Sequence, residues 1–221
     1  MIPTIFYCYD AYCGWCFGFS PVIRQLANEY QHKLAFETLS GGMIPKESAQ
    51  HIGKIAEYIQ GAYHTVEKTT GIQFGEDYLW HIKNPDKSDW FPHSDKAATA
   101  LIIFKELFPD KSVEFAAELQ KALHYEGRDL TDDEAYRHLL DKYDIHATEF
   151  YEKLNSEQYH EKTIYEYTLV KQLQVNGFPA VLLQTDELKF FLLTRGYTNY
   201  ETLKERIDRI LQDLENKTQY P

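Results

Sequence analysis

The sequence predicts an α/β protein whose small mixed sheet is interrupted by a large inserted helical block. Two observations carry this prediction. Strand-like runs stand near both ends of the chain, at residues 4–10, 33–40, 180–185 and 188–194. The long stretch from about 46 to 173 instead repeats its apolar residues at helical spacing. The expected element order is therefore β-α-β, then the helical block, then β-β-α.

The N-terminal part predicts a βαβ unit. Residues 4–10 are β-branched and aromatic, which is typical of a short buried strand. Apolar residues then recur on one helical stripe over residues 13–30, where Pro21 is expected to kink the helix. Residues 33–40 alternate well enough for a second strand. A pair of glycines at 41–42 closes the unit, whose crossover we expect to be right-handed.

The helical block contains recognisable helix starts. Ser94 precedes an apolar stripe, and Thr131–Glu134 has the pattern of a capping box. We expect two domains, a discontinuous one made of residues 1–45 and 174–221, and an inserted helical domain made of residues 46–173.

The C-terminal part predicts a hairpin and a final helix. Two apolar runs joined at residues 186–187 have the pattern of an antiparallel hairpin. An amphipathic segment over about 199–216 follows, and it begins at a second capping box, Thr198–Glu201.

Composition describes an ordinary globular chain and limits its partners. The 221 residues are 43% hydrophobic and 26% charged, and no apolar run approaches the roughly 18–20 residues that a membrane-spanning helix needs. The formal net charge of −11 repels phosphate backbones and anionic lipids, so we expect neither nucleic acid nor a membrane as a partner. The N-terminus has no basic region followed by an apolar one, which favours a cytoplasmic location.

The three cysteines indicate chemistry rather than a disulfide framework, because their number is odd and they lie within nine residues. In Cys13-Gly14-Trp15-Cys16 the first cysteine falls where a strand runs into a helix, so free backbone N–H groups can stabilise its thiolate. Cys16 lies one turn deeper on the same face and can resolve a mixed disulfide formed at Cys13.

A zinc half-site is the main alternative, since Cys8 adds a third thiolate to the pair. No second pair of this spacing exists, however, and no histidine lies at ligand spacing near these cysteines. We therefore expect neither a metal nor another cofactor. Cys8 is expected to be a small buried hydrophobic residue, with a secondary redox role as the alternative.

A remote segment supports the redox interpretation. Gly177-Phe178-Pro179 precedes the predicted hairpin, at the position where thioredoxin-fold proteins carry a cis-proline against their cysteine pair. With this segment the whole chain resembles the DsbA family, a thioredoxin-like fold with an inserted helical domain, near the cytosolic branch described as FrnE-like. The stretch Tyr125–Thr131 also resembles that family's helical domain.

The resemblance implies roles for particular residues. It makes Cys13 the nucleophile, Cys16 the resolving thiol and Pro179 the cis-proline. The aromatic residues nearby, Tyr12, Trp15 and Phe178, are expected to form an apolar lip that binds extended polypeptide, with Trp15 exposed.

The sequence also departs from the family pattern. Tyr7 stands where these proteins have a buried acidic residue, and Asp10, three residues before Cys13, is a doubtful substitute. The dipeptide between the cysteines, which tunes thiolate stability, is neither that of DsbA nor that of thioredoxin. The direction of electron flow therefore stays open.

These observations favour a thiol–disulfide oxidoreductase of protein disulfide isomerase type, acting on protein thiols and disulfides or on a small thiol such as glutathione. Two alternatives remain. One is a redox-sensing adaptor that binds a protease or a regulator. The other is a glutathione-dependent transferase or isomerase of the kappa-class type, whose members share this architecture but use a serine near the position of Cys13.

Overall fold

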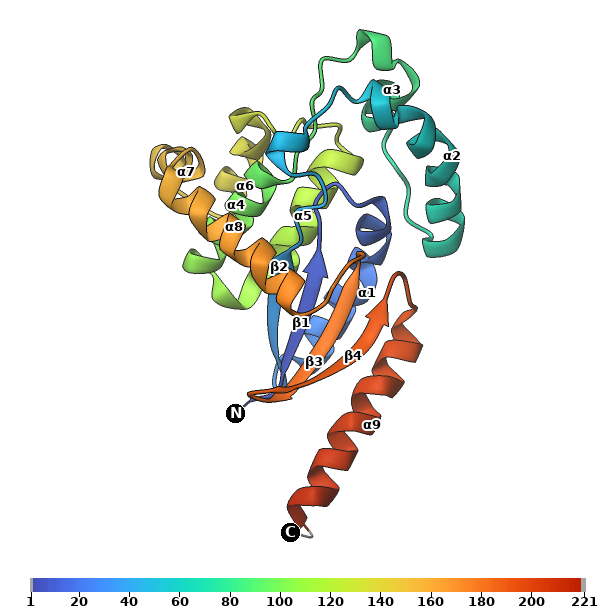
Figure 1. The fold of residues 1–221 in the computed structure, drawn as a ribbon, viewed down its shortest axis with the longest axis vertical. Coiled ribbons are helices and arrows are strands. Elements are labelled where there is room, and N and C mark those ends of the chain that lie inside the picture. The colour runs from blue at the N-terminus through green and yellow to red at the C-terminus, as the bar shows by residue number, and fades with distance from the viewer. Residues whose placement is uncertain (1, 220–221) are drawn as a thin grey trace.

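The computed structural model describes residues 2–219, with side chains up to residue 216. Its centre is a four-stranded sheet in the order β2-β1-β3-β4 (Figure 1). Strand β1 (Thr4–Tyr9) pairs in parallel with β2 (Ala35–Ser40) and antiparallel with β3 (Ala180–Asp186), which forms a hairpin with β4 (Lys189–Arg195). The predicted discontinuous domain, residues 1–45 and 174–221, includes residue 1 and residues 220–221, which lie outside the described residues.

Helices connect and surround the strands in the expected order. Helix α1 (Gly14–Tyr30) joins β1 to β2, and α9 (Tyr200–Gln219) follows β4. Between β2 and β3 the chain forms α2 (Gly53–Thr70), α3 (Glu76–Lys83), α4 (Asp95–Leu107), α5 (Ser112–His124), α6 (Arg137–Lys142), α7 (Ala147–Leu154) and α8 (Glu157–Gln172), with 3₁₀ helices at Lys46–Ser48, Pro85–Lys87, Pro109–Lys111 and Asp133–Tyr136. No helix between residues 2 and 219 is long and apolar enough to cross a membrane.

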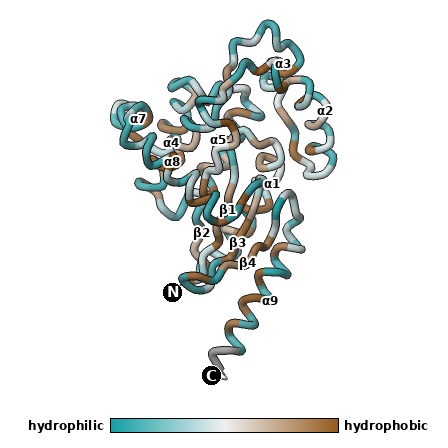
Figure 2. The backbone as a smooth tube through the Cα atoms, viewed as in Figure 1, coloured by the Kyte–Doolittle hydropathy of each residue, from teal (hydrophilic) through white to brown (hydrophobic). Residues whose placement is uncertain are grey.

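The two faces of the sheet bury different residues, because successive side chains of a strand point to opposite faces. On one face Ile5, Tyr7 and Tyr9 are buried against a core that includes α1 and α9. On the other face Cys8 belongs to a smaller apolar cluster with Val170 of α8. Figure 2 shows hydrophobic residues along the strands and hydrophilic ones around α7.

The hairpin differs slightly from its prediction. Asp186 pairs with Lys189 inside the sheet, so the turn consists of Glu187 and Leu188 rather than residues 186–187. Helix α9 also begins later than its predicted capping box: Asn199 Oδ1 accepts the N–H of Thr202 at 2.9 Å. The hydroxyl of Thr198 instead lies 2.6 Å from that of Thr194, so it does not cap the helix.

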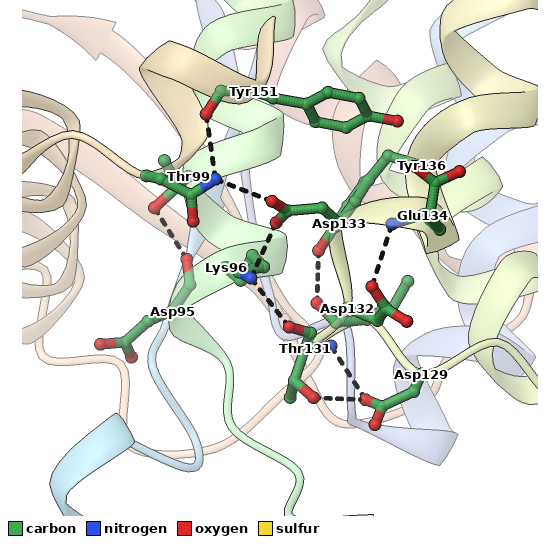
Figure 3. A network of polar contacts seen from close by, with 12 residues as sticks. Asp95, Lys96, Thr99, Asp129, Thr131, Asp132, Asp133, Glu134, Tyr136 and Tyr151 are labelled. Carbon is green, nitrogen blue, oxygen red and sulfur yellow. Dashed lines mark hydrogen bonds and ion pairs between the residues drawn. The ribbon is translucent and has the colours of Figure 1, made fainter. Parts of the chain in front are cut away.

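The predicted capping box at Thr131–Glu134 is also wrong by one residue. Asp132 caps the 3₁₀ helix by accepting the N–H of Glu134, whereas the Thr131 hydroxyl donates to Asp129 Oδ1 at 2.7 Å. Figure 3 shows the network around this turn, in which Lys96 of α4 donates to Asp133 Oδ1 and to the Thr131 carbonyl, both at 2.8 Å. These bonds join the turn to α4.

A buried ion pair ties two helices to the end of β2. Lys105 of α4 donates to Glu166 Oε2 of α8 at 2.6 Å and to Glu37 Oε1 of β2 at 2.8 Å. Glu166 Oε1 in turn accepts the backbone N–H of Ser40 at 2.7 Å, which satisfies a donor on this edge strand. The side chain of Glu166 is only 8% exposed, so its charge depends on these partners.

We predict that Lys105→Met lowers the free energy of unfolding by about 3 kcal/mol, because it leaves the Glu166 carboxylate buried without its cation. Urea unfolding measures the loss. Lys162→Met is the matched control: it removes an ion pair with Glu106 between the same two helices, but both side chains are 39% exposed, so the expected loss is less than about 1 kcal/mol. Equal losses in the two variants would contradict the argument from burial.

Candidate active site

The two cysteines occupy different depths of the first turn of α1. Cys13 is the N-cap residue, and its Sγ accepts the backbone N–H of Cys16 at 3.2 Å. Cys13 is 6% exposed and lines a groove, whereas Cys16 is fully buried beneath it. Both are free thiols. The outer sulfur is therefore the one that a second molecule can reach.

Burial makes the two thiols chemically unequal. It raises the pKa of the Cys16 thiol well above its usual value, and the hydrogen bond with Cys13 adds to that effect. At Cys13, the N–H of the first helical turn points at the sulfur, and such a bond is stronger when its acceptor is negatively charged. The geometry therefore suits an outer sulfur that attacks as a thiolate and an inner one that stays protonated until it is needed.

The segment before β3 lies against the outer cysteine. The Phe178–Pro179 peptide bond is cis, and the Cys13 thiol donates to the Phe178 carbonyl oxygen at 3.6 Å. The Phe178 ring packs on Gly41, where a Cβ atom would come within 1.8 Å of the ring. Gly41 therefore lets this segment lie close to the end of β2.

Asp10 holds the loop that leads to Cys13. Its carboxylate is 1% exposed and accepts hydrogen bonds from the N–H groups of Tyr12 (3.0 Å) and Met43 (2.7 Å) and from the Ser94 hydroxyl (3.0 Å). Burial nevertheless raises the pKa of Asp10 above its ordinary value. Ser94 thus does stand at the start of α4, but its hydroxyl binds Asp10 instead of capping the helix. Asp10 is therefore a structural residue that connects the loop before Cys13, the segment after β2 and the start of α4.

Tyr7 does not supply the missing acidic group. Its side chain is buried, and its hydroxyl has no hydrogen-bond partner among the described residues. The Tyr7 ring packs against Tyr9 and against Phe19 of α1, with centroids 5.5 and 5.8 Å apart. Burial raises the pKa of Tyr7 well above its usual value, so it remains a neutral core residue.

His124 is a site neighbour that the sequence did not reveal. It lies at the end of α5 and is 1% exposed, with Nε2 3.1 Å from the Ala11 carbonyl oxygen. Because a carbonyl oxygen only accepts, Nε2 carries the proton. The ring stacks on Phe17 at a centroid distance of 5.1 Å, and burial lowers the pKa of His124 to about 3. The neutral imidazole therefore holds the loop one residue before Tyr12.

The aromatic residues expected near the cysteines do come together. Tyr12, Trp15 and Phe178 all line the groove over Cys13, whose volume is about 380 Å³. Trp15 is half-buried rather than exposed, because its ring lies 6.4 Å from that of Tyr197. The far wall is α2, a helix that sequence reasoning did not connect with the cysteines.

Cys8 takes no part in this groove. It lies on the opposite face of the sheet from Tyr7 and is fully buried in the cluster under α8. Burial, with a smaller contribution from the charge of Glu166, raises the pKa of its thiol to about 12. Among residues 2–219, no three His, Cys, Asp or Glu side chains are grouped so that they could hold a metal ion.

Comparison with known proteins identifies the fold. The sequence matches the family model of the DSBA-like thioredoxin domain over residues 4–208. A search of curated proteins finds no match.

Several solved structures share the architecture over nearly the whole chain. A candidate protein disulfide isomerase from Nitrosomonas europaea superposes with a TM-score of 0.81 and 24% identity, covering 96% of this chain and 99% of the other. The cytosolic disulfide reductase DsbM from Pseudomonas aeruginosa gives 0.77 and 22%, covering 95% and 98%. A 2-hydroxychromene-2-carboxylate isomerase gives 0.67 and 11%, covering 96% and 98%. The expected thioredoxin-like fold with its helical insertion is confirmed.

We predict that protonation of the unfolded chain at His124 weakens the fold in mild acid. The folded imidazole stays neutral down to about pH 3, whereas the unfolded one binds a proton below about pH 6.5, so stability falls as the pH drops through this window. Between pH 7 and pH 5 the loss from this group is about 2 kcal/mol. Urea unfolding at both pH values should show a correspondingly smaller loss for His124→Gln.

His64→Gln is the control for that experiment, because the His64 side chain is 71% exposed. It should keep the wild-type dependence on pH. A His124→Gln chain whose stability falls as steeply as that of the wild type would show that His124 is not the group responsible.

We predict that Gly41→Ala destabilises the chain by about 1–3 kcal/mol, because the added methyl group displaces the Phe178 ring. Urea unfolding measures the loss, and Phe178→Leu in the same chain should recover part of it. Gly61→Ala is the matched control: nothing lies within 4 Å of its Cβ position in α2, so it should be neutral or stabilising. A Gly41→Ala chain as stable as the wild type would contradict the close packing.

Proposed function

This chain belongs to the DSBA-like thioredoxin domain family, and on that premise we propose that it is a thiol–disulfide oxidoreductase of protein disulfide isomerase type. In this proposal Cys13 is the nucleophile, Cys16 is the resolving thiol, and Pro179 belongs to the segment that places the substrate. The observation that carries the proposal is the unequal pair of free thiols at the start of α1, one opening into a groove and one buried.

The reaction follows from this arrangement. The Cys13 thiolate attacks one sulfur of a substrate disulfide, a new sulfur–sulfur bond forms at Cys13, and the other substrate sulfur leaves as a thiolate. Cys16 then attacks Cys13 Sγ, and its proton passes to the second departing sulfur. The first departing thiolate takes up the proton that Cys13 gave to the solvent when it ionised. The substrate thus gains two electrons and two protons in total, and the chain is left with a Cys13–Cys16 disulfide. The same steps in reverse oxidise a dithiol.

The groove residues serve the first step. Tyr12, Trp15 and Phe178 line the groove together with Cys13 and offer apolar contact to a substrate, while the Phe178 carbonyl oxygen offers a backbone acceptor beside the sulfur. Isomerisation of non-native disulfides begins with the same attack by Cys13. Another thiol of the substrate then displaces Cys13 and releases the substrate before Cys16 reacts.

The structural neighbours suggest which partners and which location to test first. One neighbour is described as a cytosolic disulfide reductase, and a second structure of it, with a TM-score of 0.72, is described with GSH. Reduction of protein disulfides or exchange with a small thiol, in the cytoplasm, therefore belongs to the proposal.

We predict that Cys13→Ser reduces the insulin-reduction rate to that of the buffer, because no accessible nucleophile remains. Cys16→Ser should instead accumulate a mixed disulfide at Cys13, visible by mass spectrometry of the intact protein. Cys8→Ala is the matched control and should keep the wild-type rate, since that thiol lies outside the groove. Full activity in Cys13→Ser would overturn the proposal.

A further inference from the structure

One peptide group in the turn before Cys13 is held at both ends by buried partners. Its carbonyl oxygen, that of Ala11, accepts the Nε2–H of His124 at 3.1 Å. Its N–H, that of Tyr12, donates to Asp10 Oδ1 at 3.0 Å. Because a peptide group is planar, two bonds at its opposite ends fix the orientation of the whole plane. Side chains outside the cysteine motif therefore set the direction in which the chain enters Cys13.

The same imidazole also contacts the chain beyond the cysteine motif. Its ring stacks on Phe17 with the centroids 5.1 Å apart, and the Phe17 N–H donates to the Cys13 carbonyl oxygen at 3.0 Å. Cys13 itself closes the turn, because its N–H donates to the Asp10 carbonyl oxygen at 3.1 Å. His124 of α5 thus holds the chain on both sides of the motif.

Stability gives little reason for a histidine at position 124. Phenylalanine would keep the aromatic packing there, which includes the rings of Phe74 and Tyr78 at 5.4 and 5.0 Å. Either residue leaves one buried acceptor unpaired among the described residues: Nδ1 of the histidine, or the Ala11 oxygen opposite a phenylalanine. The two arrangements therefore cost a comparable free energy. What histidine changes is that the unpaired acceptor lies on its own packed ring and not on the turn that carries Cys13.

The imidazole acts through its position and not through a charge. Burial lowers the pKa of His124 to about 3, so the ring is neutral in the pH range in which thiols ionise. A neutral ring cannot stabilise a thiolate by its charge, so the influence of His124 on Cys13 passes through the backbone of the turn.

We propose that His124 is a positioning residue for Cys13, whose hydrogen bond to the Ala11 carbonyl oxygen sets the turn so that the Cys13 sulfur faces the N–H of Cys16. That N–H donates to the sulfur at 3.2 Å, and such a bond is stronger to a thiolate than to a thiol. When the turn shifts, the thiolate loses part of this bond and forms only at higher pH. The inference rests on the proposed role of Cys13 as the nucleophile and adds that α5 of the helical insertion controls it.

Three substitutions at position 124 separate the hydrogen bond from the ring. His124→Phe keeps a ring and removes the donor, His124→Gln keeps an N–H donor and removes the ring, and His124→Met, which is similar in length to the Gln variant, removes both. The measurement is the rate at which iodoacetamide alkylates Cys13 in the reduced chain over a range of pH, followed by mass spectrometry of the intact protein. Cys16 does not compete, because it is fully buried.

The expected result is a shift in the pH at which the alkylation rate is half its maximum. This midpoint should be about 0.5–1 pH unit higher in the Phe and Met variants than in the wild type, the net effect of about one hydrogen bond. The Gln variant should stay close to the wild type. A raised midpoint in the Gln variant with a wild-type one in the Phe variant would assign the effect to the ring and overturn the proposal.

His81→Phe is the matched control, because His81 also stacks on an aromatic ring and makes one hydrogen bond. Its partners are the Trp90 ring at 3.8 Å and the Ser88 hydroxyl at 2.8 Å, both outside the turn before Cys13. It should keep the wild-type midpoint. Urea unfolding shows which variants are folded, and if the Phe variant is not, the Gln and Met variants decide: equal midpoints in these two would overturn the proposal.

Alkylation needs no substrate disulfide, so it separates this inference from the proposed function. Raised midpoints in the Phe and Met variants, with no insulin reduction by the wild-type chain, would support the positioning role and overturn the proposed function. Insulin reduction by the wild-type chain, with equal midpoints in all the variants, would overturn the positioning role alone.

Discussion

The site depends on the buried carboxylate of Asp10. A charged or polar group this far from water has to be hydrogen-bonded, and the three donors that satisfy Asp10 come from different parts of the chain. One is in the loop before Cys13, one follows β2, and one, Ser94, starts α4. If any one of them moves away, the buried carboxylate loses one of its three hydrogen bonds. These bonds therefore hold the loop before Cys13, the groove edge at Met43 and the start of α4 in one arrangement.

The inserted helical segment is accordingly part of the site. Helix α5 places His124 against the Ala11 carbonyl oxygen and under Phe17, and α2 forms the outer wall of the groove. The sheet and α1 supply the two thiols and the Phe178–Pro179 segment, the parts that the proposed exchange chemistry uses. Of the inserted helices, α5 supports the loop before Cys13 through His124, and α2 adds an apolar wall to the groove.

The sequence predicts the features that depend on interactions between residues a few positions apart. The strands, the helical block and the Cys13–Cys16 spacing were readable because period, β-branching and helix geometry act over a few residues. The sequence pattern places the caps at Thr131 and Thr198, one residue too early, because those hydroxyls bind Asp129 and Thr194 instead. No sequence pattern identifies His124, because it contacts Ala11, which is 113 residues away along the chain. Trp15 was expected in solvent, but its neighbour Tyr197 comes from the other end of the chain.

The distance along the chain between Cys13 and Phe178 has a consequence for how the protein is made. The two residues are 165 positions apart, and a ribosome that adds about 5–20 residues per second needs roughly ten to thirty seconds to travel between them. Throughout that time both thiols lie on an unfinished chain that has neither the groove nor the Phe178 carbonyl beside Cys13. The completed fold cannot shield them then. Their state during synthesis is set by the thiol–disulfide balance of the surroundings.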